Sequence, residues 1–344
     1  MPLRRLLCQN AVYAHTTARA HSTMQRSLFK PDLNMIKKLR IATEAPFKDV
    51  KSALVASRGD YDGAFEWLRK KGIASATAKS TRSTLEGLVG ISVGNNIAAM
   101  VQVNSETDFV ARNEKFQTFV ASIASSVQSS CQMKESWKEL LAKESLLALS
   151  VGNENGQSAQ LAQIIPQLVG KVGENIVIQR ACKVRVDEGI IASYLHNSIG
   201  KHLGRIGALV AISFPGTIDT NKQELIKKAG QQLAMHIAAA KPKYLDPNSI
   251  PKDVIENERR ILSEQVQECG KPPSIVKKMI EGKLEKYYSE VTLVEQNHLI
   301  HDGNPKVCKV LEILSNDVGV PVKIEGFQRF EVGEETENLD RKSD

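Results

Sequence analysis

The chain has 344 residues, of which 42% are hydrophobic and 25% charged, a composition typical of a globular protein with two or three domains. No apolar run approaches the ~18 to 20 residues that a bilayer span needs, so the sequence predicts no membrane partner. The five cysteines are widely separated and form no CxxC pair. This spacing argues against a zinc knuckle, a redox dithiol or a disulfide scaffold, and it favours a reducing compartment.

The formal net charge of +7 is concentrated at the amino terminus, because residues 1–31 carry five basic and no acidic side chains. The rest of the chain is therefore nearly neutral, whereas nucleic-acid binding normally requires a concentrated basic face. We expect no direct nucleic-acid partner. An Arg-rich, acid-free leader containing Ser and Thr is typical of a mitochondrial transit peptide. We assign that role to residues 1–32, which predicts localisation in the mitochondrial matrix; a disordered basic tail is the alternative.

Residues 33–72 contain three short segments in which apolar residues recur with helical spacing. The first two segments are separated by Thr43–Pro46, and the third, after Arg58–Asp60, is expected to end at Gly72. Three short helices in forty residues suggest a small bundle like the ubiquitin-associated domain. Residues 73–85 show no apolar period and are interpreted as a linker.

A strand hairpin opens the next region, residues 86–186. Apolar residues alternate on either side of a Gly94-Asn95-Asn96 turn, which predicts strands at 87–93 and 97–103. A helical stripe that includes Phe116 and Phe119 begins near Asn113. The polar loop 104–113 between them holds Phe109, which either extends the buried stripe of the helix or projects from the loop.

The remainder of this region is expected to form three helices and then one strand. The predicted elements are helices at 113–131 and 135–149, a surface loop at 152–156, a helix at 161–168 broken by Pro166, and a strand at 176–186.

The following residues, 187–333, repeat the same order of signals. Glu188-Gly189, a strand, an interruption, a strand at 205–212 and a helix at 223–240 parallel Glu86-Gly87 and the elements after it. We interpret the two regions as related α/β subdomains; two unrelated hairpins with similar periodicity are the alternative. Pro251 and Pro273 each open a helix in the second region, which predicts a helical hairpin at 251–290. A helix at 307–314, a strand at 322–332 and an acidic tail at 334–344 complete the chain.

The predicted fold is therefore α+β: an N-terminal three-helix ubiquitin-associated-like bundle, then a core of two related α/β subdomains with antiparallel sheets and a projecting helical hairpin. No phosphate-loop, GxGxxG, HExxH or GxSxG motif is present, so we expect no cofactor and no enzymatic chemistry. The histidines lack acidic partners at fixed spacing, which predicts no metal site. Trp67 and Trp137 are predicted to lie in the core.

Several ordered blocks between about residues 33 and 333 resemble one family. They are SETDFVARNEKF, VGENIVIQR, the segments 194–196 and 205–209, MHIAAAKP, GKPPSIVKKMIEGKLEKYYSEV and GFQRFEVGE. Together they resemble translation elongation factor Ts, the guanine-nucleotide exchange factor for elongation factor Tu. The resemblance implies mitochondrial elongation factor Tu, GDP-bound or nucleotide-free, as the partner, and an action by binding alone. It also implies that the helical hairpin can mediate self-association.

The resemblance also implies which residues contact the partner. In this family the aromatic side chain of the signature loop enters the nucleotide-binding domain of the GTPase, a role that falls to Phe109, with Asp108 beside it and Val172-Gly173 as the adjoining loop. The implied contacts of the N-terminal module are Arg40, Phe47 and Lys48, and that of the second subdomain is His196. The chain departs from the family pattern at Glu44, where a Gly is usual, and at Val50, where a Cys is usual. A tRNA- or ribosome-binding factor without exchange activity is the alternative function, and an enzyme is a third.

Overall fold

The computed structural model describes residues 29–130, 133, 137–152, 158–267 and 272–334. The predicted transit peptide lies almost wholly outside the described residues, as do nearly all of the predicted loop at 152–156 and of the tail. The chain divides into two compact units, Met1–Trp67 and Leu68–Asp344, which we call the N-terminal and C-terminal units and describe separately.

Three helices form the N-terminal unit, as predicted: α1 (Leu33–Thr43), α2 (Phe47–Ala56) and the first turns of α3 (Tyr61–Lys79). Their small core is fully buried at Leu39, Val50 and Leu54. The predicted end of the third helix at Gly72 is wrong, because α3 continues to Lys79 through most of the predicted linker. Its later turns belong to the C-terminal unit, where Ala76 packs on the main core.

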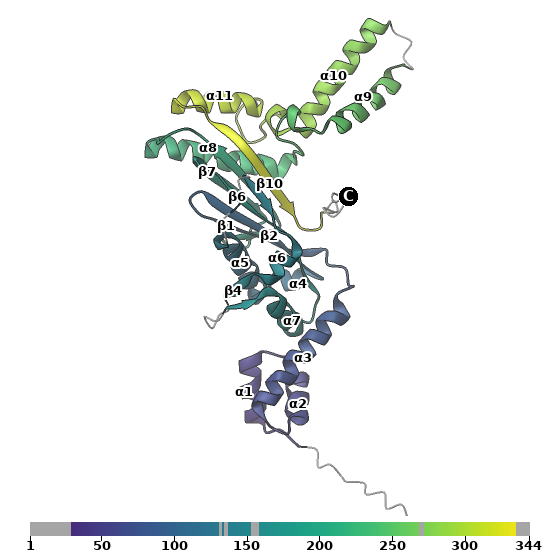
Figure 1. The fold of residues 1–344 in the computed structure, drawn as a ribbon, viewed down its shortest axis with the longest axis vertical. Helices are drawn as coiled ribbons and strands as arrows, with labels where there is room; N and C mark the ends of the chain where they lie inside the picture. Colours follow the sequence, from purple (N-terminus) through teal and green to yellow (C-terminus); the bar gives the residue numbers. More distant parts are fainter. Residues whose placement is uncertain (1–28, 131–132, 134–136, 153–157, 268–271, 335–344) are drawn as a thin grey trace, which may run out of the picture. The chain divides into compact units, whose positions relative to one another are not determined.

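Two antiparallel sheets organise the C-terminal unit (Figure 1). The first has the order β3-β6-β2-β1-β8, and the second has the order β10-β9-β7. Their strands are β1 (Glu86–Val93), β2 (Ile97–Ser105), β3 (Lys138–Leu140), β6 (Ile176–Arg185), β7 (Gly189–His196), β8 (Leu203–Gly204), β9 (Ile206–Ser213) and β10 (Lys323–Glu331). A separate pair is formed by β4 (Ser150–Gly152) and β5 (Ser158–Gln160).

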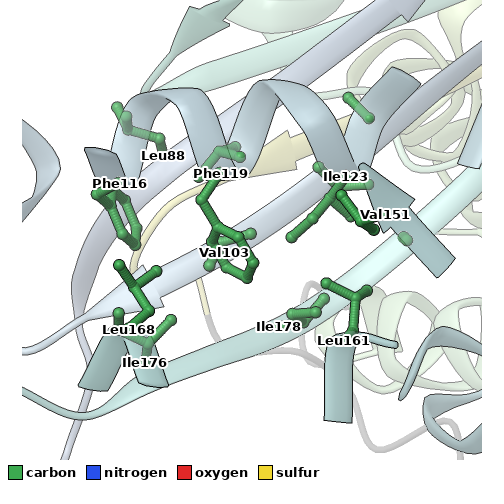
Figure 2. Packing of buried hydrophobic residues seen from close by; sticks show 14 of the residues in the cluster. Leu88, Val103, Phe116, Phe119, Ile123, Val151, Leu161, Leu168, Ile176 and Ile178 are labelled. Atoms are coloured by element: carbon green, nitrogen blue, oxygen red, sulfur yellow. The ribbon is translucent and has the colours of Figure 1, made fainter. Parts of the chain in front are cut away.

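The two sheets pack face to face, with helices on the outer face of each. Alternate residues of a strand point to opposite faces, so Met100 on β2 meets Leu209 on β9 between the sheets. The other face of the first sheet is covered by α5 (Glu114–Ser129) and α7 (Leu161–Val172), whose apolar side chains form the main core shown in Figure 2. The other face of the second sheet is covered by α8 (Thr220–Ala240) and α11 (Val307–Val318).

The two halves of the C-terminal unit have the same order of elements, as we expect if the two subdomains are related. Each begins with a hairpin, β1–β2 or β7–β9, followed by a long helix; each ends with a 12-residue helix and a strand that pairs with the second hairpin strand. The opening glycines, Gly87 and Gly189, both have positive φ, and a Cβ on either would lie within 2.2 Å of a carbonyl oxygen on the neighbouring strand. Both hairpins therefore require glycine at the same place.

Three predictions in this unit are wrong. The predicted helix at 135–149 is instead the edge strand β3, which pairs with β6, followed by the short helix α6 (Lys143–Ala148). Pro166 does not break α7, which continues to Val172; burial of Leu161, Leu168 and Val169 holds the helix across the lost backbone hydrogen bond. Trp137 is half-buried, packed against the cluster between the sheets rather than inside it. Trp67, the last residue of the N-terminal unit, is half-buried as well.

A helical hairpin of α9 (Lys252–Gln267) and α10 (Pro273–Val291) is present, as predicted, and the two helices lie side by side. Leu262 and Leu284 are the buried leucines of the pair. At the base of the hairpin, the Lys243 and Tyr244 amides both donate to the Val291 carbonyl. The base is thus fixed by backbone hydrogen bonds from residues outside the hairpin to the last residue of α10.

Candidate partner-binding site

The hairpin β1–β2 delivers the loop between β2 and α5. The last residue of β2, Ser105, pairs with Glu86, and the Asn113 side chain accepts from the Lys115 amide at 3.0 Å and begins α5. Between these fixed ends, residues 108–111 form the short helix α4 (Asp108–Ala111). The expected polar loop therefore contains one helical turn.

Phe109 projects from this turn. Its side chain is 77% exposed, whereas Phe116, seven residues later, is fully buried. Val110 and Ala111 on the same turn are buried against the main core, so the turn is anchored on one side and presents Phe109 on the other. The interpretation that Phe109 extends the buried stripe of α5 is excluded.

Asp108 is half-exposed and forms an ion pair with Arg112 at 2.9 Å, one helical turn away. An exposed pair of this spacing contributes at most about 0.5 kcal/mol to stability. Asp108 therefore remains available as a polar neighbour of Phe109.

A second loop, between α7 and β6, lies against the first. The Glu174 carboxylate accepts from the Thr107 amide at 2.9 Å and from the Thr107 hydroxyl at 2.6 Å. In the opposite direction, the Glu106 carboxylate accepts from the Asn175 amide at 2.6 Å. Arg82 forms an ion pair with Glu106 at 3.4 Å. The two loops are thus joined by reciprocal bonds to carboxylates.

Val172 is the last residue of α7, and Gly173 begins this second loop. Val172 is half-buried on the main core, and Gly173, exposed with φ 83, ends α7 in the left-handed conformation. A Cβ added at Gly173 would meet no atom within 4 Å, so the space beside it is open. The structure therefore brings together four of the implied site residues: Asp108, Phe109, Val172 and Gly173.

The three implied residues of the N-terminal unit lie on its surface. Arg40 is exposed near the end of α1, and Phe47, 48% exposed, begins α2 with Lys48 beside it. Between the two helices, Glu44 has φ 55. A left-handed conformation costs a non-glycine residue roughly 1 to 2 kcal/mol, which explains why Gly suits this position in the resembled family.

His196 is exposed at the end of β7, where it pairs with Ile206. Its Nδ1 lies 3.3 Å from the Tyr194 hydroxyl. Among the described residues, no hydrogen bond or ion pair links His196 to the loops that hold Phe109 and Gly173. It remains a separate candidate contact on the second subdomain.

Sequence reasoning missed the residues that join the two loops. Glu106 and Glu174 both stand in motifs that we quoted, yet their roles depend on contacts between segments 67 and 69 residues apart. The available signal was the position of each glutamate, in a polar run at the end of a strand or a helix.

The described histidines include one buried pair on α8 and the connection to α11. His236 and His298 have ring centroids 5.1 Å apart, and both rings accept a backbone amide at Nδ1. Burial lowers the pKa of His298 to about 4 and lowers that of His236 as well. The residues that the structure describes hold no group of three or more potential ligands that could bind a metal ion, and none of their helices has both the length and the hydropathy of a membrane span.

The fold and the site define an α+β protein that presents an exposed aromatic side chain on a helical turn of one loop, which is hydrogen-bonded to a second loop. The family model Elongation factor TS matches residues 106–334. Proteins named Elongation factor Ts are similar over most of their length: that of Paramagnetospirillum magneticum is 41% identical over 301 residues, covering 88% of this chain and 91% of the relative. Those of Rhodospirillum rubrum and Gluconobacter oxydans are 40% and 39% identical, with 87% of this chain covered in both cases. The chain belongs to the elongation factor Ts family.

Proposed function

We propose that this chain binds mitochondrial elongation factor Tu in its GDP-bound form and promotes release of GDP, so that GTP can bind and polypeptide elongation can continue. The observation that carries the proposal is the 77% exposure of Phe109 on a turn whose last two residues, Val110 and Ala111, are buried. A large exposed aromatic side chain is unfavourable in water and is typical of an interface anchor. Family membership supports elongation factor Tu as the partner.

The proposed mechanism needs binding energy and no covalent chemistry. A protein that binds the nucleotide-free GTPase more tightly than the GDP-bound form must weaken GDP binding by the same factor, because coupling between two ligands is reciprocal. Phe109 is the side chain that makes the difference between the two states, by entering the nucleotide-binding domain beside the phosphate and magnesium site. Asp108 and Gly173 flank it, and Arg40, Phe47 and Lys48 hold the partner through the N-terminal unit.

The mitochondrial part of the proposal rests on the Arg-rich, acid-free leader. Similarity to bacterial relatives agrees with an organelle of bacterial origin. The proposed location is the matrix.

Release of labelled GDP from purified elongation factor Tu tests the function. We expect a substoichiometric amount of the full chain to accelerate release, and we expect unlabelled GDP in the medium to be exchanged in. Release at the rate of elongation factor Tu alone would overturn the proposal. Salt-sensitive binding of tRNA without elongation factor Tu would instead favour a tRNA-binding factor.

A further inference from the structure

The bonds between the loops at 106–107 and 174–175 form a closed unit, which we call the carboxylate clip: Glu106, Thr107, Glu174 and Asn175. Both oxygens of Glu174 accept from Thr107, one from the amide and one from the hydroxyl. Glu106 accepts from the amide of Asn175, the residue next to Glu174. Each loop therefore supplies one carboxylate and one backbone donor to the other.

The clip is also bonded to a third segment, residues 80–82. The Asn175 side chain is 4% exposed and donates to the Arg82 carbonyl at 3.1 Å and the Ser80 carbonyl at 3.5 Å. The Arg82 guanidinium reaches back to Glu106. Hydrogen bonds to ionised groups are about twice as strong as neutral ones, so three segments of the chain, residues 80–82, 106–107 and 174–175, are held at one point.

Thr107 is the residue immediately before α4, the turn that carries Phe109. Its own side chain makes no capping bond to the turn, because its hydroxyl is bonded to Glu174. A single helical turn of four residues is unstable by itself, since nucleation costs more than one hydrogen bond returns. The direction of α4 is therefore set at its two ends: by the clip at Thr107, and by the burial of Val110 and Ala111.

We propose that Glu174 and Glu106 are positioning residues for nucleotide exchange, which hold the Phe109 turn in its binding conformation before the partner arrives. The proposal rests on the proposed function, in that Phe109 is taken as the exchange anchor. A side chain that is already ordered loses less conformational entropy on binding. Removal of the clip lets the turn α4 adopt other orientations. The Phe109 ring is then in the orientation that binds the partner for a smaller fraction of the time.

A double-mutant cycle between Glu174 and Phe109 tests the proposal, with GDP release measured per folded molecule of the full chain. Glu174→Gln keeps the shape of the side chain but removes its charge. It also replaces one carboxylate oxygen with an NH2 group, which cannot accept a hydrogen bond from Thr107. We expect it to slow stimulated release about tenfold, the change that corresponds to one lost hydrogen bond to a charged group. In the Phe109→Ala background, the same substitution should change the rate less than about twofold, because the side chain it positions is gone. Equal losses in both backgrounds, or no loss in the first, would overturn the proposal.

Two further variants test whether the effect of Glu174→Gln comes from the lost hydrogen bonds or only from the changed net charge. Thr107→Val removes only the hydroxyl donor and should give a smaller loss with the same dependence on Phe109. Glu114→Gln, in the first turn of α5, removes an equal charge five residues from Phe109 without touching the clip. We expect it to leave exchange unchanged; a loss equal to that of Glu174→Gln would assign the effect to net charge and overturn the positioning role.

Hydrogen–deuterium exchange separates this proposal from the proposed function, since it needs no partner. In Glu174→Gln, the peptide covering residues 105–112 should exchange about tenfold faster, while peptides from α5 stay as in the unmodified chain. If the deuterium exchange of residues 105–112 is unchanged, burial alone orders the turn. That result would refute the positioning role of Glu174, even if GDP release is stimulated normally. If the unmodified chain stimulates no GDP release, the proposed function fails, and the positioning role in exchange fails with it.

Discussion

Gly207 on β9 lies so close to Met100 on β2 that a Cβ added at Gly207 would be 2.8 Å from the Met100 sulfur. The same Cβ would be 2.7 Å from Val89 on β1. Both distances are shorter than van der Waals contact. At Gly207 itself, β9 therefore places no side chain between the two sheets, and this close approach joins the two halves of the C-terminal unit.

Gly207→Val is expected to destabilise the C-terminal unit. Overpacking a well-filled core costs about 1 to 3 kcal/mol, and neither sheet can move away without exposing the cluster between them. Urea unfolding measures the change. Gly282→Ala on α10, where an added Cβ meets no atom within 4 Å, is the matched control and should stabilise by up to about 1 kcal/mol. Equal stability of Gly207→Val and the unmodified chain would contradict this packing.

Stability should fall with acid in a range set by His298. Its side chain is 1% exposed, and burial lowers its pKa from 6.5 to about 4. Because the unfolded chain binds a proton more readily, the stability that neutral His298 provides is complete above pH 6.5 and is lost as the pH falls toward 4. The expected loss over that range is on the order of 3 kcal/mol, and the lowered pKa of His236 adds to it in the same direction.

His298→Asn tests the assignment, because Asn can still accept the Ile300 amide as an Asx turn but does not titrate. The slope of unfolding free energy against pH between 6.5 and 4 should become shallower, whatever the stability at pH 7. The same substitution at exposed His202 serves as the control and should leave the slope unchanged. A slope unaffected by His298→Asn would assign the acid sensitivity elsewhere.

Local patterns in the sequence predicted the hairpins, the long helices and the fold class. They failed where a distant partner decides the structure. Residues 138–140 have no strand pattern of their own, yet they pair with Val184, Lys183 and Cys182 of β6. The later turns of α3 have no apolar period, but they are rich in Ala, a strong helix former. Gly72 within them allows a close approach, since its Cβ would lie 3.2 Å from the Pro166 carbonyl.

In the candidate site, too, local patterns identified some features, whereas others depend on contacts between distant residues. Phe109 could be singled out because it is the aromatic residue of a polar loop and stands in a quoted family motif. The spacing of seven residues from Phe116 left two interpretations open, and only the burial of Val110 and Ala111 decides that Phe109 points outward. The clip depends on contacts between residues up to 69 apart, for which a single sequence has no periodic signal.

The predicted leader gives a test that is independent of exchange. Its Arg-rich, acid-free composition predicts import and removal, so the protein recovered from mitochondria should begin between Arg19 and Leu33. Mass measurement of the intact matrix protein gives the terminus directly. A matrix form that still begins at Met1 would contradict the assignment.

The hairpin of α9 and α10 is expected to be an accessory to exchange. Its base is fixed at the end of α10, where the Lys243 and Tyr244 amides donate to the Val291 carbonyl and the Leu293 amide donates to the Tyr244 carbonyl. Replacing residues 256–286 with a short Gly-Ser turn should therefore leave the sheets folded and GDP release stimulated. Circular dichroism and the exchange assay on one preparation check both points. A folded deletion without exchange activity would place the hairpin within the partner-binding site.

Phe109 and Phe116 form a matched pair for the central prediction, since they are the same residue type seven positions apart with opposite burial, 77% and 0% exposed. Truncating an interface anchor costs about 2 to 4 kcal/mol of binding, so Phe109→Ala should slow stimulated GDP release on the order of thirtyfold or more. Its unfolding free energy should change by less than about 0.5 kcal/mol, as expected for an exposed position.

Phe116→Ala should do the reverse. Truncating a buried Phe costs about 3 to 5 kcal/mol of stability, while the molecules that remain folded still present Phe109. Thermal midpoint and exchange rate per folded molecule, measured on both variants, separate the two roles. A large loss of stability in Phe109→Ala with the exchange rate per folded molecule preserved would return Phe109 to the core and remove it from the partner-binding site.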